Sequence, residues 1–397
     1  MPPSASVPAG APPGDRLRVA LDATPLLGAP TGVGRFCAGA LRALAGRPEL
    51  EVRAFAVTWR RRDRLPPLVP SGVGVRQRAM PARPLHLVWA HLPVPGVEWF
   101  VGPADAVHGT NFVVPPCRRA ARVVTVHDLT TVRFPEMCDR STLGFPRMVR
   151  RAVAEGAWVH TPSQFVADEV VAVLGADPGR VRAVHHGVTP PSGTPPTVPP
   201  AATPSGDGPA GRLPPQVHRY LLAVGTIEPR KDYPGLVRAF DAVAGSRPDL
   251  GLVVAGADGW GAEAFHEALA SARCRDRVVE LGYVPDGALA RWLAGAAALA
   301  FPSVYEGFGF PPLEAMAAGV PVVATAAGAI PEVVGDAAVL VPPGDVDALA
   351  QALAEVLDDD ARRVALVEKG RCRAAAFTWE ACGEGLSALY ADAAGAR

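Results

Sequence analysis

Lysine is almost absent from this chain of 397 residues, because arginine supplies nearly all of its basic charge. The two lysines are Lys231 and Lys369. Basic and acidic residues both number 39, so the formal charge is zero. A surface that wraps nucleic acid needs a clear basic excess, and we therefore predict no nucleic-acid partner. Lys369 is expected on a solvated face, whereas Lys231 stands in one of the two segments richest in functional signals.

Cysteine pairs and long apolar runs are missing as well. The six cysteines show no CxxC pair and no Cys/His metal spacing, so we predict reduced, mostly buried thiols and no metal site. No stretch reaches the ~18–20 apolar residues of a membrane-spanning helix. Residues 1–15, rich in Pro, Ala and Gly, lack the basic and apolar regions of a signal peptide and are expected to form a disordered tail. These absences predict a cytoplasmic protein, attached at most peripherally to the inner face of the membrane.

What is present is a double series of short apolar runs that alternate with helical patterns. The strand candidates are residues 17–23, 51–58, 105–109, 121–128 and 156–163, and then 220–225, 251–256, 277–284, 298–303 and 320–325. Such alternation predicts parallel sheets covered by helices on both faces. We therefore expect an α/β chain of two Rossmann-like, doubly wound domains that face each other across a cleft.

A proline-rich segment separates the two series. Ten of the residues 190–215 are proline, and apolar periodicity disappears there, which is typical of a linker. The expected domains are therefore 16–189 and 216–377. Residues 378–397 form one more amphipathic pattern, and we expect this helix to pack back toward the N-terminal domain.

Two acids and a glycine loop follow a strand candidate of the second domain. Glu306 lies in a Gly/aromatic loop, and Glu314 falls about one turn into a helix whose start is marked by Pro311 and Pro312. Compensation of the helix dipole is the simplest explanation for Glu314. It explains neither the second carboxylate nor the loop 307–309, whose backbone amides can approach a phosphate closely. We interpret the two acids as acceptors for sugar and ribose hydroxyls.

The stretch from Gly225 to Lys231, GTIEPRK, is the second signal. Arg230 and Lys231 stand between the carboxyl end of a strand candidate and a helix that Asp232 is placed to cap. A solvated charged loop is the alternative for such a pair. The strand edge, the amides of the adjoining helix and the rarity of lysine favour an anion site, in which Arg holds phosphate oxygens bidentately and Lys acts as a point charge.

Both segments resemble the large family-4 group of retaining glycosyltransferases, which have the GT-B fold. Its signatures are a G-T-x-x-x-R-K stretch, matched by residues 225–231, and an E-x7-E motif, matched by Glu306 and Glu314. Further matches run over nearly the whole chain: T-G-V-G-R at 31–35, T-V-H-D at 125–128, T-P-S-x-F at 161–165 and H-x-G-V at 185–188. The glycine loop together with T-V-H-D looks most like the mannosyltransferase branch that acts on bacterial polysaccharides.

The resemblance implies a nucleotide-sugar donor bound mainly by the second domain. Arg230 and Lys231 would neutralise the donor pyrophosphate as the sugar–phosphate bond breaks, in place of a metal. Glu314 would bind the ribose hydroxyls and Glu306 those of the donor sugar, while the amides of 308–310 would add donors. The implied donor-binding residues are Gly32, Gly34, Gly225, Thr226, Arg230, Lys231, Glu306, Gly307, Phe308, Gly309, Phe310 and Glu314.

In the first domain, the resemblance implies that Gly32 and Gly34 let a loop backbone close on the donor. His127 would sit beneath the reacting carbon, and Asp128 near the acceptor. Arg35 would contact acceptor or phosphate, a plain helix-surface role being the alternative. A satisfied polar residue at a strand end is the alternative for His127, and a helix cap for Asp128. The implied catalytic residues are His127, Asp128, Glu306, Arg230 and Lys231.

Other polar residues are expected to be structural. Four histidines of the first domain belong to these structural residues, namely His108, His160, His185 and His186. Gly32-x-Gly34 resembles the start of a dinucleotide fingerprint, but Cys37 stands where the third glycine belongs. The D-x-D of residues 345–347 resembles a metal motif, but it follows Pro-Pro-Gly and opens a helix, so we expect it to be a cap.

The sequence thus predicts transfer of a hexose with retention, with mannose from GDP-mannose favoured, to a saccharide or lipid-linked acceptor and without a cofactor. The alternatives are a UDP- or dTDP-sugar-dependent transferase of the same family, a GT-B epimerase or glycogen-synthase-like elongator, and a non-catalytic sugar-nucleotide binder. A nicotinamide dehydrogenase is disfavoured because the fingerprint is missing. If the acceptor is lipid-linked, clustered arginines of the first domain predict a peripheral membrane contact, although solvated faces are their default. They are Arg60, Arg61, Arg62, Arg64, Arg118, Arg119, Arg122, Arg147, Arg150 and Arg151.

Overall fold

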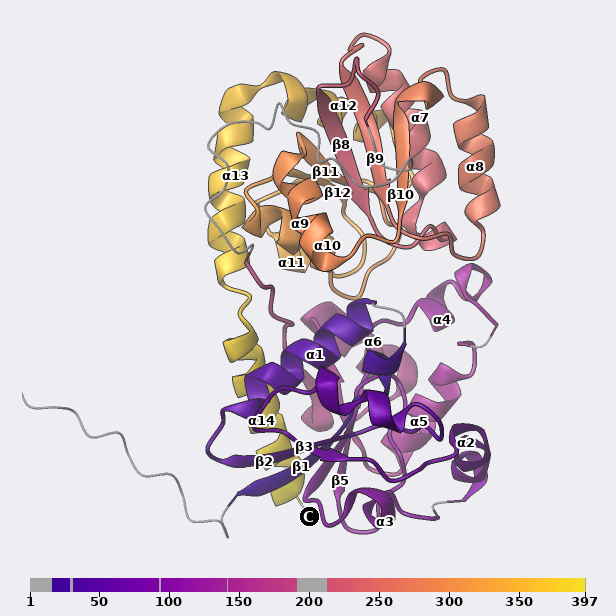
Figure 1. Ribbon diagram of the computed structural model, residues 1–397, viewed down its shortest axis with the longest axis vertical. Coiled ribbons are helices and arrows are strands. Elements are labelled where there is room, and N and C mark those ends of the chain that lie inside the picture. The colour runs from indigo at the N-terminus through magenta and orange to yellow at the C-terminus, as the bar shows by residue number, and fades with distance from the viewer. Residues whose placement is uncertain (1–15, 29–30, 93, 141, 191–212, 397) are drawn as a thin grey trace, which may run out of the picture.

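A computed structural model describes residues 16–28, 31–92, 94–140, 142–190 and 213–396 (Figure 1). The expected tail, 1–15, and the expected linker apart from residues 190 and 213–215 lie outside the described residues.

The first sheet contains seven parallel strands with helices packed around it. The strands are β1 (Leu17–Asp22), β2 (Leu50–Phe55), β3 (Gly74–Arg76), β4 (Ala106–Gly109), β5 (Ala121–Thr125), β6 (Trp158–Thr161) and β7 (Val181–Ala183). Their order is β3-β2-β1-β4-β5-β6-β7. The helices are α1 (Gly32–Ala45), α2 (Ala82–His91), α3 (Glu98–Val101), α4 (Thr130–Arg133), α5 (Phe145–Ala154) and α6 (Gln164–Leu174).

The second sheet repeats this plan with six parallel strands. They are β8 (Arg219–Val224), β9 (Leu250–Ala255), β10 (Val278–Gly282), β11 (Ala298–Phe301), β12 (Val322–Thr325) and β13 (Val339–Val341), in the order β10-β9-β8-β11-β12-β13. The helices are α7 (Tyr233–Ala244), α8 (Ala262–Ser271), α9 (Asp286–Gly295), α10 (Phe310–Ala317), α11 (Ile330–Val334), α12 (Val346–Asp358), α13 (Asp360–Ala375) and α14 (Trp379–Gly395). Both orders start in the middle of the sheet and run to one edge before returning, which is the doubly wound pattern.

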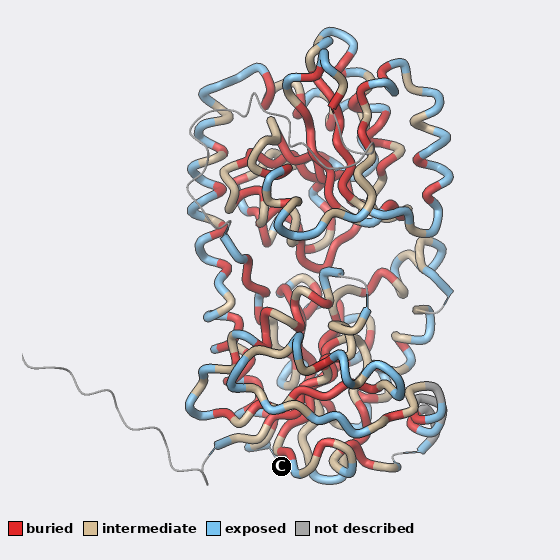
Figure 2. Tube along the Cα trace, viewed as in Figure 1, coloured by how far each residue is buried: buried red, intermediate tan, exposed pale blue. Residues whose placement is uncertain are grey.

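Burial explains why both sheets need helices on two sides. Every residue of β4, β9, β11 and β12 is buried, and Figure 2 shows the buried strands inside each half of the molecule. A strand that is buried on both faces must be covered twice. The predicted α/β fold of two parallel-sheet domains is therefore confirmed.

Three strands and four helices were not predicted. The strands β3, β7 and β13 have three residues each and form the edges of the sheets, so none offers a recognisable apolar run. The helices α3, α4 and α11 have four or five residues each, and α2 lacks a regular apolar stripe. The series of strands in the second half therefore ends at β13 and not at residue 325.

The last helix, α14, packs beside α1 of the first sheet, as Figure 1 shows in yellow and indigo. Leu386, Leu389 and Tyr390 belong to the apolar core that α1 and β1 share. We call the first sheet, its helices and α14 the N-terminal lobe, and the rest the C-terminal lobe. Among the helices of the described residues, none combines the length and the hydropathy that a bilayer-spanning segment requires.

Candidate active site

Two cations form ion pairs with one buried carboxylate at the carboxyl ends of β8 and β11. The Nζ atom of Lys231 lies 2.6 Å from one Glu306 oxygen, and Arg230 lies 2.7 Å from the other. Arg230 also pairs with Glu228 at 2.6 Å. The structure therefore brings together the acid and the two cations that the sequence singled out from segments 75 residues apart.

Local features of the chain hold the two cations in place. Both lie in a 3-10 turn, Pro229–Lys231, just before α7, which Asp232 caps as expected by accepting from the amide of Gly235 at 3.0 Å. A side chain at position 225 would crowd the aliphatic part of Lys231, because a Cβ there would lie 3.2 Å from Lys231 Cε. Gly225 avoids this close contact. Thr226, next to it, is exposed.

The charges of this cluster are strongly coupled. Burial alone would raise the pKa of Glu306, but the Arg230 guanidinium and the Lys231 ammonium hold that pKa at about 2, below its usual 4.5. Burial lowers the pKa of Lys231 in spite of Glu306. Glu306 and Glu228 keep the pKa of Arg230 above its usual value although burial opposes this. The Glu306 carboxylate is thus fully ionised at neutral pH.

The loop after Glu306 touches the N-terminal lobe. A Cβ at Gly307 would lie 1.8 Å from the carbonyl oxygen of His127, so only glycine fits this close approach. Ser163 of the N-terminal lobe donates to the Gly307 carbonyl at 2.8 Å. Gly309 has φ +128°, a conformation that side chains disfavour. Contact between the lobes is therefore one structural reason for this glycine loop.

His127 and Asp128 lie directly opposite that loop, at the carboxyl end of β5. A ring nitrogen of His127 lies 2.8 Å from the Thr110 carbonyl oxygen, and burial lowers the pKa of the imidazole. Asp128 accepts from the Thr130 amide, the first of α4, at 2.9 Å, although the N-cap residue of that helix is Leu129. Asp128 also lies near enough to Arg230 to raise that pKa. The two residues therefore face the charge cluster across the lobe junction.

Arg35 links the second acid of the motif to the N-terminal lobe. Its guanidinium lies 2.5 Å from Glu314 in α10 and 2.9 Å from Asp286 at the start of α9. Burial raises the pKa of Glu314 although Arg35 opposes this. Arg35 is thus a bridge between lobes and not a plain helix-surface residue. Asp286 was missed by the sequence reasoning, and its place just after a strand was the available signal.

The expected glycine loop near residue 32 is wrong in one respect. Gly32 and Gly34 lie in the first turn of α1, because Thr31 caps the helix by accepting from the Gly34 amide at 3.3 Å. Gly32 still faces the other lobe, since a Cβ there would lie 3.6 Å from the Phe310 ring. Residues 29–30 of the loop lie outside the described residues.

Aromatic rings fill the junction beneath these residues. His186 stacks on Phe36 with ring centroids 4.3 Å apart and on Phe310 at 5.3 Å, and it lies 4.9 Å from Phe308. His108 and His160 share the hydroxyl of Thr125 at 2.7 and 2.9 Å and are structural, as expected. Among the described residues, His186 has no hydrogen-bond partner for either ring nitrogen.

Polar contacts that the sequence reasoning missed also join the lobes. Glu332 accepts from the amides of Gln164 and Phe165 at 2.8 Å each and lies 2.7 Å from a ring nitrogen of His185. The Tyr305 hydroxyl donates to Glu169. Glu332 lies in the first turn of the short helix α11, where no sequence motif marks it.

Asp345 is a helix cap, as expected. It caps α12 by accepting from the Ala348 amide at 2.9 Å.

Comparison with known proteins identifies the family. Residues 212–373 match the family described as "Glycosyl transferases group 1". The "O-antigen chain mannosyltransferase B" of Escherichia coli is 31% identical over 288 residues, which cover 69% of this chain and 71% of that protein. The chain belongs to the group 1 glycosyltransferases.

Two further comparisons concern a mannosyltransferase sequence and a solved structure. The "MMP alpha-(1->4)-mannosyltransferase" of Mycolicibacterium hassiacum is 45% identical over 112 residues, 27% of each chain. The solved structure of a sucrose-phosphate synthase from Thermosynechococcus elongatus superposes with a TM-score of 0.70 at 22% identity, covering 96% of this chain and all of that one. The fold is therefore GT-B, and the family is one of retaining enzymes that use nucleotide-sugar donors.

Proposed function

We propose that this glycosyltransferase moves mannose from GDP-mannose, with retention, to a saccharide or lipid-linked acceptor, without a metal. The observation that carries the proposal is the convergence of two cations on one carboxylate, since Arg230 and Lys231 lie 2.7 and 2.6 Å from the two oxygens of Glu306. Two of the relatives are mannosyltransferases, which supports mannose as the sugar.

The donor is assigned to the C-terminal lobe, residues 216–377. Arg230 and Lys231 together bring two positive charges to the carboxyl edge of β8, which is where a leaving diphosphate needs them. Glu306 then holds hydroxyls of the sugar, and Glu314 those of the ribose. The amides of Phe308, Gly309 and Phe310 lie at the start of α10, where a helix favours an anion.

The reacting sugar lies between the lobes in this proposal. His127 is kept neutral by burial, so its imidazole can hydrogen-bond a sugar hydroxyl beneath the reacting carbon without repelling the cations. Asp128 stands toward the acceptor in the N-terminal lobe, residues 16–189. The leaving diphosphate takes the proton of the acceptor hydroxyl as the new bond forms and the old sugar–phosphate bond breaks. Exclusion of water between the lobes limits hydrolysis.

We place the enzyme in the cytoplasm, with the clustered arginines of the N-terminal lobe resting on the inner face of the membrane when the acceptor is lipid-linked. Several of these arginines are exposed, among them Arg60, Arg118 and Arg147. Anionic lipid attracts such side chains.

The first experiment is a thermal-shift screen with GDP-, UDP-, dTDP- and ADP-sugars. Binding raises the melting temperature by mass action, and GDP-mannose should raise it most. A larger shift with a uridine or thymidine donor would reject the guanine donor and keep the family. No shift with any of the four would leave the protein without donor binding and would reject the proposed reaction.

The second experiment uses the two lysines as a matched pair. Lys231→Ala should abolish transfer, because one of the two phosphate-neutralising charges is lost, while the melting temperature shows that the chain stays folded. Lys369→Ala is the control, since Lys369 pairs on the surface with Asp336 at 2.7 Å and should leave transfer unchanged. Full activity in Lys231→Ala would contradict the proposed role.

A further inference from the structure

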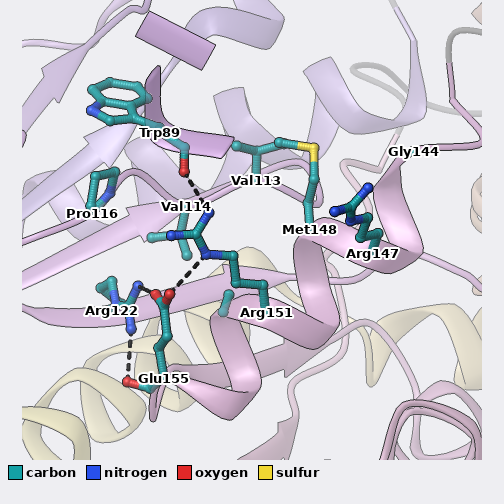
Figure 3. Close-up of a pocket in the computed structure, with 11 residues that line it drawn as sticks. Trp89, Val113, Val114, Pro116, Arg122, Gly144, Arg147, Met148, Arg151 and Glu155 are labelled. Atoms are coloured by element: carbon teal, nitrogen blue, oxygen red, sulfur yellow. Dashed lines mark hydrogen bonds and ion pairs between the residues drawn. The ribbon is translucent and has the colours of Figure 1, made fainter. Parts of the chain in front are cut away.

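A cavity of about 500 Å³ lies in the N-terminal lobe, between α2 and α5 and against the loop that joins β4 to β5 (Figure 3). Most of its walls are apolar. They are formed by Trp89, Val113, Val114, Pro116 and Met148. The volume is in the range of pockets that bind small molecules, which are typically lined by apolar side chains with a few polar groups at chosen places.

Charged side chains lie at both ends of this cavity, and they are mostly positive (Figure 3). Arg122 and Arg151 both pair with Glu155, at 2.7 and 2.8 Å. Arg147 is exposed and has no ion-pair partner among the described residues. Three arginines against one glutamate leave an excess of positive charge beside an apolar space, which suits a ligand with an apolar body and an anionic head.

Exposed apolar side chains flank the cavity. Val88 and Leu143 are the sequence neighbours of Trp89 and Gly144, which line it. Val88 is 37% exposed and Leu143 is 43% exposed. Exposed apolar side chains next to an apolar space are typical of an interaction site.

Two stacked aromatic rings lie between the wall of the cavity and the active site. Phe112, the neighbour of Val113, stacks on Phe145 with ring centroids 5.0 Å apart and lies 5.9 Å from the His127 ring. Phe145 begins α5, the helix that carries Met148 into the cavity. The end of the cavity at Arg147 is therefore nearer to His127 than the end at Arg122 and Glu155, which lie where β5 begins and just after α5 ends.

We propose that this cavity holds the apolar chain of a lipid-linked acceptor with a phosphate-bearing head. The proposal rests on the proposed function, because it names the class of acceptor. The apolar walls remove the chain from water, and Arg147 attracts the phosphate at the end of the cavity that lies toward Phe145, so the sugar-bearing head lies on the side of Asp128. A free saccharide would bury no apolar chain against these walls.

The test measures binding of alkyl phosphates by calorimetry, below their micelle concentration and with GDP present to occupy the donor phosphate site. Affinity should rise up to about fourfold for each methylene from hexyl to decyl phosphate, as expected for burial of an apolar chain. Inorganic phosphate should show no measurable binding. Arg147→Glu should weaken binding of decyl phosphate but not of decanol.

Filling the cavity provides the decisive variant. Val113→Trp should lower the affinity for decyl phosphate at least tenfold. Ala264→Trp is the matched control, since it puts the same bulk into a groove between α7 and α8 in the other lobe and should change nothing. Circular dichroism melting curves verify folding, and Met148→Trp replaces Val113→Trp if the latter does not fold. Equal affinity in the filled variant and the wild type would overturn the proposal.

A vesicle assay separates the acceptor chain from bulk lipid. Val113→Trp and the wild type should sediment equally with phosphatidylglycerol vesicles. Loss of sedimentation in the variant alone would mean that the cavity takes a chain from the bilayer, which overturns the acceptor assignment. Absence of nucleotide-sugar binding would reject the proposed function instead, and the alkyl phosphate affinities would still be measurable.

Discussion

Replacing Glu306 by Gln removes the negative charge that Arg230 and Lys231 share. The pKa of Glu306 is about 2 in the folded chain against an ordinary 4.5, a difference of about 2.5 units. At about 1.4 kcal/mol per unit, its ionised form contributes about 3 kcal/mol to stability at neutral pH. Because 1 kcal/mol shifts the melting temperature of a domain of this size by roughly 2–4 °C, Glu306→Gln should melt roughly 6–12 °C lower at pH 7.

The pH dependence fixes the sign of this effect. A carboxyl whose pKa is depressed by folding contributes its stability above the ordinary pKa, and that contribution disappears as the pH falls from 4.5 toward 2. The difference in melting temperature between the wild type and Glu306→Gln should therefore be constant from pH 6 to pH 8 and shrink below pH 4.5. Differential scanning calorimetry over this range measures it.

A surface ion pair serves as the control for Glu306→Gln. Glu355 lies 2.5 Å from Arg362, but both side chains are about 40% exposed, so Glu355→Gln should cost no more than about 1 kcal/mol. GDP should raise the melting temperature of Glu306→Gln more than that of the wild type, since its diphosphate supplies the missing negative charge. If Glu306→Gln melts like Glu355→Gln at every pH, the account of the charge cluster is refuted.

Three further predictions concern other parts of the molecule. Gly39→Ala should destabilise the N-terminal lobe by about 1–3 kcal/mol in urea, because its Cβ would lie 2.2 Å from the Trp379 ring, whereas Gly46→Ala, with open space, should not. His127→Asn should lower kcat at least a hundredfold with little change in melting temperature, and wild-type activity between pH 6.5 and 8 should show no inflection from this imidazole, whose pKa burial lowers. Glu332→Ala should increase the radius of gyration in small-angle scattering, since the variant loses three contacts between the lobes; an unchanged radius would show that other contacts hold them together.

The sequence pattern predicts the strands that are buried on both faces but not the three-residue strands at the sheet edges. Strands such as β9, LGLVVA, are apolar runs that any parallel sheet would bury. An edge strand such as β3, GVR, is exposed at its first and last residues and takes its conformation from pairing with β2. Pairing is a tertiary effect, and three residues contain too little pattern to predict it.

The candidate site shows the same division between local and long-range information. Residue types and spacing were enough to select Glu306, Lys231 and Arg230, because each stands in a short motif. Their mutual pairing depends on the order of β8 and β11 in the sheet. The bridge from Arg35 to Glu314 spans 279 positions and two lobes, and no local pattern encodes such a partner. The need for glycine at position 307 likewise becomes apparent only from the close approach of His127 of the other lobe.

The polar contacts between the lobes bear on how a donor would enter. Arg35 pairs with one carboxylate oxygen of Glu314, to which the proposed function assigns the ribose, and the other oxygen has no hydrogen-bond partner among the described residues. The ribose and Arg35 therefore compete for Oε1. Water can replace polar contacts of this kind, and for that reason interfaces between domains of one chain open at modest cost. Binding of the donor would then exchange the Arg35–Glu314 pair for contacts with the nucleotide. Release of Arg35 from Glu314 would also free its guanidinium for the diphosphate or the acceptor, which are the two ligands that its position in the motif of residues 31–35 suggests.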